Sequence, residues 1–209
     1  MVRKNMHKII SVNGVSITIN KKDILNNINL EIYDEGISVI TGHNGAGKST
    51  LLKIMAKILY PTEGNVSYNR DITHLASSFI FQKPIFLNRT VKDNLLYALK
   101  NSKEKSNNES LIMEQLAKFD LSHLYNCPAK KLSSGEQQLI AFIRSIIIKP
   151  LILFLDEPTS SLDKKNKTLV NHMLLNLSES IKIIVTSQSM EQTKLFTDKP
   201  LVMQNGMLI

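Results

Sequence analysis

Several residue types are scarce in this chain, and each shortage excludes a class of protein. The 209 residues include no tryptophan and a single cysteine, Cys127, which excludes an internal disulfide and suits a reducing compartment. No apolar run reaches the roughly 18 residues that a membrane-spanning helix needs. The basic residues 1–8 are not followed by a long apolar segment, so a signal peptide is a poor interpretation. These absences together predict a cytoplasmic protein.

Acidic residues are fewer than basic ones, and the chain carries a formal net charge of +8. One interpretation is a partner with phosphates, such as nucleic acid or an anionic membrane surface. The alternative is a compositional bias, because lysine, asparagine and isoleucine are all plentiful. The basic residues are scattered, whereas a nucleic-acid-binding surface requires a clustered basic footprint. We therefore expect no nucleic-acid partner for this chain. Hydrophobic residues make up 43% of the sequence, which is enough for one globular domain with a core.

Residues 42–50, with the sequence GHNGAGKST, fit the phosphate-binding P-loop pattern G-x-x-x-x-G-K-[ST]. An apolar run at 37–40 predicts a strand before the loop, and residues 51–56 predict a helix after it. The amides of such a loop point at negative charge. In this motif Lys48 would contact the β- and γ-phosphates of a nucleotide, and Ser49 would ligate Mg²⁺. The alternative is a glycine-rich turn that only begins a helix. The candidate nucleotide-binding residues of this loop are Gly42, Asn44, Gly45, Ala46, Gly47, Lys48, Ser49 and Thr50.

Strand patterns occupy both ends of the chain. Alternating apolar and polar positions in residues 9–32 predict two paired strands. Turn residues at 60–64 are expected to end the helix that follows the P-loop. Further strands are predicted at 66–68, at 78–81, at 181–185 and in a terminal hairpin around Asn205 and Gly206.

Helical patterns dominate the middle of the chain. Thr90 followed by Asp93, and Ser133 followed by Glu136, have the spacing of capping boxes that open helices. Residues 100–110 are polar and low in complexity, which predicts an exposed loop. Further helices are predicted at 111–119 and 164–177.

Two carboxylates follow the most apolar strand of the sequence. Residues 151–155 are consecutively apolar, which predicts a strand buried on both faces of a parallel sheet. Asp156 and Glu157 would stand at its carboxyl end, where open α/β sheets place their ligands. Asp156 would hold Mg²⁺ through water, and Glu157 would orient and deprotonate an attacking water. The alternative is a strand end with two solvated acids.

The order of these motifs resembles the nucleotide-binding subunit of an ATP-binding cassette (ABC) transporter. Three further motifs agree with that family: Gln82 after a strand, the signature-like residues 132–138 (LSSGEQQ) and the D-loop-like residues 160–163 (SSLD). The resemblance covers nearly the whole chain. It implies an α/β fold, a P-loop NTPase (RecA-like) core with an antiparallel β subdomain and an inserted α-helical subdomain. The single ABC ATPase domain would span 1–209, with the core at about 1–83 and 150–209 and the helical subdomain at about 84–149.

The resemblance also implies a mechanism. Two such subunits sandwich two ATP molecules head to tail with Mg²⁺, and this closure and its reversal drive transport by a transmembrane permease. The subunit would therefore be peripheral on the inner face of the cell membrane. Gln82 would sense Mg²⁺ and the attacking water, and it would link the site to the helical insert that receives the permease. The remaining implied nucleotide contacts are Ser133, Ser134, Gly135 and Glu136, which reach the ATP of the other subunit, and Asp163.

Three positions depart from the family pattern. Ser187 stands where the family usually has a histidine that contacts the γ-phosphate, and a serine hydroxyl is neutral and shorter. Ile19 stands where an aromatic side chain often stacks on the base. Ser134 replaces the first glycine of the signature. The first departure predicts either slow hydrolysis or a heterodimer whose other ATPase site is complete. The resemblance itself allows a homodimer or a heterodimer with another ABC ATPase subunit.

Three function classes compete at this point. The leading one is the ATPase subunit of an ABC transporter, and residues 81–95 resemble importers of oxyanions such as tungstate or phosphate. The second is a soluble ABC ATPase of DNA repair or translation, which the single P-loop and the absence of sustained heptads disfavour. The third is a slow or non-hydrolysing ATP clamp on a membrane partner, which Ser187 keeps open. Because the chain stops soon after its final hairpin, we expect no C-terminal regulatory domain.

Overall fold

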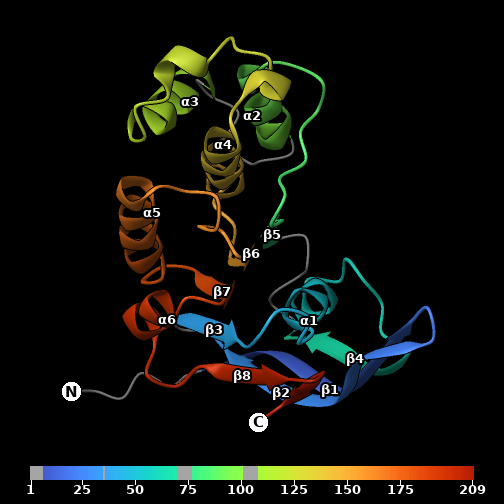
Figure 1. The fold of residues 1–209 in the computed structure, drawn as a ribbon. Helices are drawn as coiled ribbons and strands as arrows, with labels where there is room; N and C mark the ends of the chain where they lie inside the picture. The colour runs from blue at the N-terminus through green and yellow to red at the C-terminus, as the bar shows by residue number, and fades with distance from the viewer. Residues whose placement is uncertain (1–6, 35, 70–76, 101–107) are drawn as a thin grey trace. The chain divides into compact units, whose positions relative to one another are not determined.

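The computed structural model describes residues 7–34, 36–69, 77–100 and 108–209 (Figure 1). The chain divides into two compact units. The first unit contains Met1–Phe79, Leu151–Glu157 and Met173–Ile209, and the second contains Ile80–Pro150 and Pro158–His172. Each unit is described separately.

An antiparallel sheet of three strands lies in the first unit. Strand β1 (Lys8–Ile19) pairs with β2 (Lys22–Tyr33) on one side and with β4 (Glu63–Tyr68) on the other. Asn20 and Lys21 join β1 to β2 with φ angles of 50° and 63°, the left-handed values that a tight two-residue hairpin turn requires. The paired strands that the alternating pattern predicted in residues 9–32 are confirmed.

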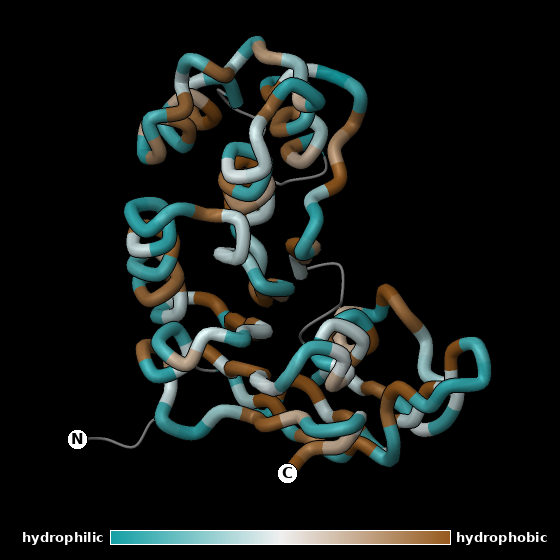
Figure 2. Tube along the Cα trace, viewed as in Figure 1, coloured by the Kyte–Doolittle hydropathy of each residue, from teal (hydrophilic) through white to brown (hydrophobic). Residues whose placement is uncertain are grey.

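A second, larger sheet provides the frame for the candidate site. Its strands follow the order β5-β6-β7-β3-β8-β9, and β6, β7, β3 and β8 run parallel to one another. Every residue of β6 and β7 is buried, as expected for strands covered on both faces, and Figure 2 shows the central strands as largely hydrophobic. The strands of this sheet are β3 (Ile37–Thr41), β5 (Ser77–Ile80), β6 (Ile152–Asp156), β7 (Lys182–Ser187), β8 (Leu201–Gln204) and β9 (Met207–Leu208).

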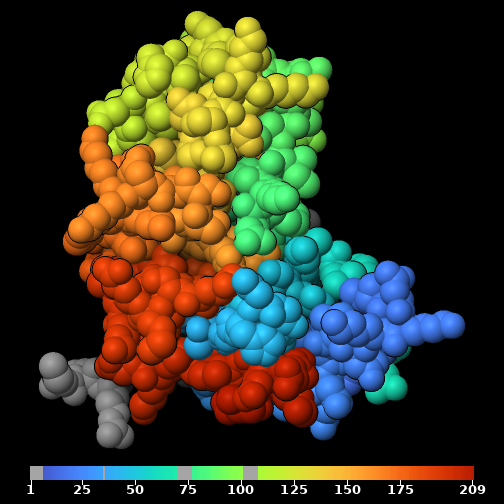
Figure 3. Space-filling view, in the orientation of Figure 1, coloured from blue at the N-terminus to red at the C-terminus, as the bar shows by residue number. Residues whose placement is uncertain are grey.

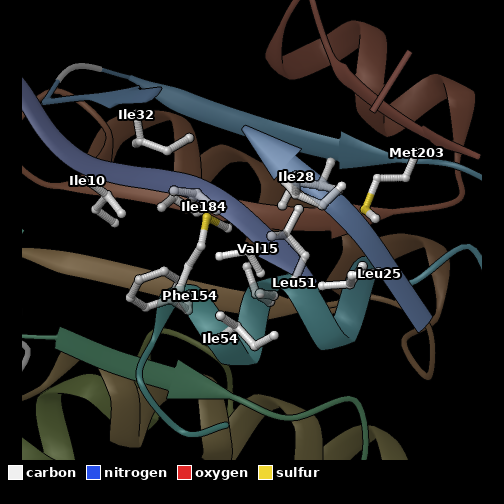
Figure 4. Packing of buried hydrophobic residues seen from close by; sticks show 14 of the residues in the cluster. Ile10, Val15, Leu25, Ile28, Ile32, Leu51, Ile54, Phe154, Ile184 and Met203 are labelled. Carbon is white, nitrogen blue, oxygen red and sulfur yellow. The ribbon is translucent and has the colours of Figure 1, made fainter. Parts of the chain in front are cut away.

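Helix α1 (Lys48–Met55) anchors the first unit because its apolar side chains pack against both sheets (Figure 4). Leu51 and Ile54 lie in one buried cluster with Val15 of β1 and Phe154 of β6. The loop before α1 therefore sits on a rigid base, because close-packed interiors resist displacement. Helix α6 (Met190–Phe196) follows β7 in the same unit.

The second unit is helical. It contains α2 (Val91–Leu99), α3 (Asn108–Ala117) and α4 (Ser134–Ile146), and α5 (Lys164–Leu177) begins in it. Thr90 and Ser133 cap α2 and α4 through complete capping boxes with Asp93 and Glu136. Both predicted helix starts are thus confirmed.

Several predicted boundaries differ from those of the structure. Helix α1 ends at Met55, well before the predicted turn at 60–64, and Glu63 and Gly64 already belong to β4. The amide of Thr62 donates to the Ser16 carbonyl at 2.9 Å, so this segment has already joined the sheet.

The polar stretch at 100–110 is not wholly a loop, because residues 108–110 form the first turn of α3. An acidic residue in a first turn, here Glu109, is favourable to the helix dipole, and polarity alone misses this signal. Residues 101–107 lie outside the described residues. Leu151 is 51% exposed and precedes β6, so only four of the five apolar residues at 151–155 are buried in that strand.

Candidate functional site

The P-loop leaves β3 and enters α1 through a backbone path that glycine makes possible. Gly42 has a φ of 149°, and a Cβ atom there would lie 2.2 Å from the Met203 carbonyl oxygen. The amide of Gly206 donates to the Ala46 carbonyl at 3.2 Å, so the β8–β9 hairpin supports the loop from one side. Residues 43–45 are exposed, and the light-blue segment after β3 reaches the surface in Figure 3. An accessible loop that leads into a helix N-terminus is an arrangement that suits an anion.

Lys48 folds back over this loop. Its ammonium donates to the carbonyls of Gly42 and His43, each at 2.9 Å, and lies 4.0 Å from a carboxylate oxygen of Glu157. The side chain is only 5% exposed, and this burial lowers the pKa of Lys48, while the charges of Glu157 and Asp156 act in the opposite direction. The ammonium is thus held at the mouth of the loop, next to the carboxylates.

Asp156, at the end of β6, is the centre of a hydroxyl cluster. Its Oδ1 atom accepts hydrogen bonds from Ser49 Oγ at 2.7 Å and from Thr186 Oγ1 at 2.8 Å. The contact with Thr186 follows from strand register, because the two residues are opposite each other in the parallel pair β6–β7. Ser49 comes from the first turn of α1. Two hard oxygen donors, a hydroxyl and a carboxylate, are thereby brought together.

Glu157 leaves the strand in an unusual backbone conformation. Its φ is 48°, which a residue with a Cβ adopts at an energetic cost, and such strain concentrates at functional sites. Its amide donates to Thr186 Oγ1 at 3.0 Å. Its carboxylate accepts a hydrogen bond from the side-chain amide of Gln188 and is 13% exposed. The carboxylate is therefore held at a partly open position close to Lys48.

Thr186 and Gln188 are site residues that the sequence analysis did not single out. The available signal was positional, because both residues flank Ser187 at the carboxyl end of a strand. Ser187 itself is buried, and its hydroxyl donates to Gln192 Oε1 at 2.8 Å and accepts from the Ser189 amide at 3.1 Å. In this structure the Ser187 hydroxyl is therefore hydrogen-bonded to residues at the start of α6.

The other predicted site residues lie elsewhere. Ile19 ends β1 and is 40% exposed. Asp163 accepts hydrogen bonds from the amide and side chain of Asn166 at 2.8 and 3.1 Å, at the start of α5. The structure brings together Lys48, Ser49, Asp156 and Glu157, whereas Gln82, Ser133, Ser134, Gly135, Glu136 and Asp163 belong to the second unit.

Glu136 organises the start of α4. Its carboxylate accepts hydrogen bonds from the hydroxyl and the amide of Ser133, both at 2.7 Å. These two bonds lower the pKa of Glu136, and the bond from the hydroxyl has the larger effect. The signature residues thus form an ordered helix N-terminus. Over the described ranges, no group of three or more His, Cys, Asp or Glu side chains could hold a metal, and no helix is long and apolar enough to cross a membrane.

Comparison with known sequences identifies the family. A family model described as ABC transporter matches residues 25–160. The chain belongs to the ABC transporter family. The phosphate import ATP-binding protein PstB of Saccharolobus solfataricus is 30% identical over 99% of this chain and 88% of that protein. The tungstate uptake system ATP-binding protein TupC of Peptoclostridium acidaminophilum is 34% identical over 81% of this chain and 82% of that protein. Other relatives are named for zinc import and for energy-coupling factor transport.

Solved structures confirm the fold. The ATP-binding subunit of an ABC transporter superposes with a TM-score of 0.86 at 18% identity, over 96% of this chain and 88% of that one. The predicted fold, a P-loop NTPase core with an antiparallel β sheet and helical parts, is therefore correct.

The predicted activity is confirmed at the level of the family. The chain is the ATP-binding and ATP-hydrolysing subunit of an ABC transporter, and the non-hydrolysing clamp is not favoured. Subunits of this family dimerise and work with membrane permease components.

Proposed function

We propose that this ABC ATPase hydrolyses ATP at the cluster of Lys48, Ser49, Asp156 and Glu157. The observation that carries the proposal is the 2.7 Å hydrogen bond between Ser49 and Asp156, next to Glu157 and at the start of α1. Lys48 would exchange its contacts with the loop carbonyls for the β- and γ-phosphate oxygens of ATP. The loop amides of residues 42–50 would receive the remaining negative charge.

Ser49 and Asp156 would hold Mg²⁺. The donor set fits this ion, because Mg²⁺ prefers oxygen ligands and takes few of them from the protein, with water and phosphate oxygens filling the other positions. When bound, Mg²⁺ neutralises charge on the β- and γ-phosphates. The hydroxyl of Thr186 would keep Asp156 in place while Ser49 turns towards the ion.

Glu157 would act as the general base. Its carboxylate orients a water molecule and takes a proton from it as the water oxygen attacks the γ-phosphorus. The bond to the oxygen that bridges the β- and γ-phosphates then breaks, and ADP and phosphate are the products. A general base must lie next to the reacting water, and the partly exposed side chain of Glu157 leaves access for that water.

The rest of the machinery would come from the second unit and from a second subunit. Ser133 and Gly135 would contact the γ-phosphate held by the opposite subunit, with Ser134 and Glu136 beside them in the same nucleotide-binding segment. Asp163 would line the same interface. Gln82 would contact Mg²⁺ and the attacking water. Ile19 would pack on the base. The domain would be single, with a core at about 1–83 and 150–209 and a helical subdomain at about 84–149.

We propose an oxyanion such as phosphate or tungstate as the cargo of the complete transporter. Residues 81–95 resemble oxyanion importers, and two relatives are named for phosphate import and tungstate uptake. The subunit would sit on the inner face of the membrane, bound to its permease, as a homodimer or with a second ATPase. Ser187 in place of the usual histidine supports a slow site or a heterodimer with a complete partner site.

The first experiment measures ATP turnover by the purified chain beside Glu157→Gln. We expect Mg²⁺-dependent turnover in the wild type and a loss of turnover, with ATP binding retained, in the variant. Turnover that persists in Glu157→Gln would contradict the role of Glu157.

The second experiment isolates the permease that copurifies with the chain and measures uptake by the reconstituted complex. ATP-driven uptake of phosphate or tungstate is expected, and uptake of Zn²⁺ alone would overturn the cargo proposal.

A further inference from the structure

Residues at the end of β7 and just after it form hydrogen bonds with both the backbone and the side chain of Glu157. Thr186 accepts the Glu157 amide at 3.0 Å, and Gln188, two residues on, donates from its side-chain amide to the Glu157 carboxylate. Thr186 is the next-to-last residue of β7 and Gln188 is the first residue after the strand, so both contacts come from one three-residue stretch. Glu157 is therefore held at two points by one short segment.

The intervening Ser187 points into a different network. Its hydroxyl donates to Gln192 and accepts from the Ser189 amide, and the side chain is buried. As a donor and as an acceptor, the Ser187 hydroxyl thus bonds residues at the start of α6. The polar group at the end of β7 that does reach the candidate base is the exposed side chain of Gln188.

The chemistry of the contact suits a general base. A neutral amide donates a hydrogen bond to a carboxylate without cancelling its charge, so the carboxylate is oriented and remains able to accept a proton. Lys48, 4.0 Å away, is a cation and in the proposed mechanism moves to the phosphates of ATP. The contact with Gln188 would remain after that movement.

We propose that Gln188 is a positioning residue for ATP hydrolysis, which orients the Glu157 carboxylate towards the attacking water. In this chain Gln188, rather than the residue at position 187, would supply the polar side chain that follows β7 and supports the base. The inference rests on the proposed role of Glu157. It adds the prediction that Gln188 acts on the chemical step and not on ATP binding.

Steady-state kinetics test this with variants of Gln188. Gln188→Ala should lower kcat by about 10- to 100-fold, the effect of losing one hydrogen bond to a charged group, and leave KM within about twofold. Gln188→Glu has the same shape but places a second carboxylate against Glu157, so it should be at least as damaging. Gln188→His keeps a nitrogen donor and should recover part of kcat. Gln115→Ala, in α3 of the second unit, is the matched control and should behave as wild type.

A double-mutant comparison separates positioning from a structural role. In the Glu157→Gln background, single-turnover hydrolysis of radiolabelled ATP should be as slow with Gln188→Ala as without it, because the group that Gln188 orients is already lost. An additional loss, or a Gln188→Ala effect on KM alone, would overturn the inference. Thermal unfolding of each variant identifies any loss that comes from misfolding.

The two proposals fail in different ways. If Glu157→Gln is inactive but Gln188→Ala and Gln188→Glu retain wild-type kcat, the base assignment stands and the role of Gln188 is wrong. If Glu157→Gln turns over ATP like the wild type, both are wrong.

Discussion

The Thr186 hydroxyl connects the two acidic residues of the site, because it donates to Asp156 at 2.8 Å and accepts from the amide of Glu157 at 3.0 Å. Thr186 is fully buried and lies opposite Asp156 in the β6–β7 pair. One hydroxyl thus satisfies a carboxylate oxygen and a backbone amide where β6 ends. The strained backbone of Glu157, with φ at 48°, is stabilised by the same contact.

Replacing Thr186 by valine tests how much this hydroxyl contributes to stability and to ATP turnover. Thr186→Val keeps the shape of the side chain but leaves the Glu157 amide without this acceptor, so the free energy of unfolding should fall by about 1–3 kcal/mol. ATP turnover should fall as well, because Asp156 and Glu157 lose their common support. Urea denaturation and steady-state assays measure the two effects. Thr186→Ser, which retains the hydroxyl, is the control, and equal stability of the valine variant and the wild type would refute the explanation.

Two glycines of the P-loop should respond differently to alanine. At Gly42 a Cβ would meet the Met203 carbonyl oxygen at 2.2 Å, whereas at Gly45 nothing lies within 4 Å, although both have positive φ. Gly45→Ala should therefore cost only backbone strain, about 1–2 kcal/mol of unfolding free energy. Gly42→Ala adds a clash with backbone of the β8–β9 hairpin, for about 2–5 kcal/mol. Chemical denaturation of the nucleotide-free proteins measures both, and equal losses would contradict the clash.

Gln138 in α4 is a site where a substitution should stabilise the protein. Its side chain is buried, and neither its amide nitrogen nor its oxygen has a hydrogen-bond partner among the residues that the structure describes. Gln138→Met should raise the free energy of unfolding by about 1–3 kcal/mol, because an unsatisfied buried amide is removed.

The adjacent Gln137 provides the matched control. Its side chain donates to the Leu132 carbonyl at 3.0 Å, so Gln137→Met loses a hydrogen bond and should cost about 0.5–1.5 kcal/mol. Urea denaturation compares the two variants. A destabilised Gln138→Met would show that the amide is hydrogen-bonded in solution.

The stability of the α4 N-terminus should depend on pH through Glu136. Hydrogen bonds from Ser133 lower the pKa of Glu136 from its ordinary value of 4.5, so the folded state favours the ionised carboxylate. The stabilisation is therefore present above pH 4.5 and is lost as the pH falls through the lowered pKa. Relative to Glu136→Gln, the wild type should gain about 0.3–1 kcal/mol at pH 7 and low salt.

Denaturation curves at pH 7 and below pH 4 measure this gain. The difference between wild type and Glu136→Gln should shrink at the lower pH. In a Ser133→Ala background it should already be smaller at pH 7, because the main cause of the shifted pKa is absent. A difference that stays constant across this range would rule out the ionised carboxylate as its source.

Short-range patterns account for much of what the sequence analysis predicted. The capping boxes at Thr90 and Ser133, the helix over residues 164–177 and the hairpin around Asn205 and Gly206 depend on residues within a few positions of each other. The errors at 60–64 and at 108–110 arose where a distant strand or a helix dipole outweighed local turn or polarity signals.

By itself, the sequence determined the family, the P-loop, the carboxylates after β6 and the burial of the central strands, because these are patterns of spacing and hydrophobicity. Only the tertiary structure decided which side chains meet. Ser49 and Asp156 are 107 positions apart, and their contact exists because α1 and the ends of β6 and β7 lie together. That Thr186 and Gln188 reach Glu157 while Ser187 turns to α6 depends on strand order and strand register, which hydrophobic periodicity does not encode.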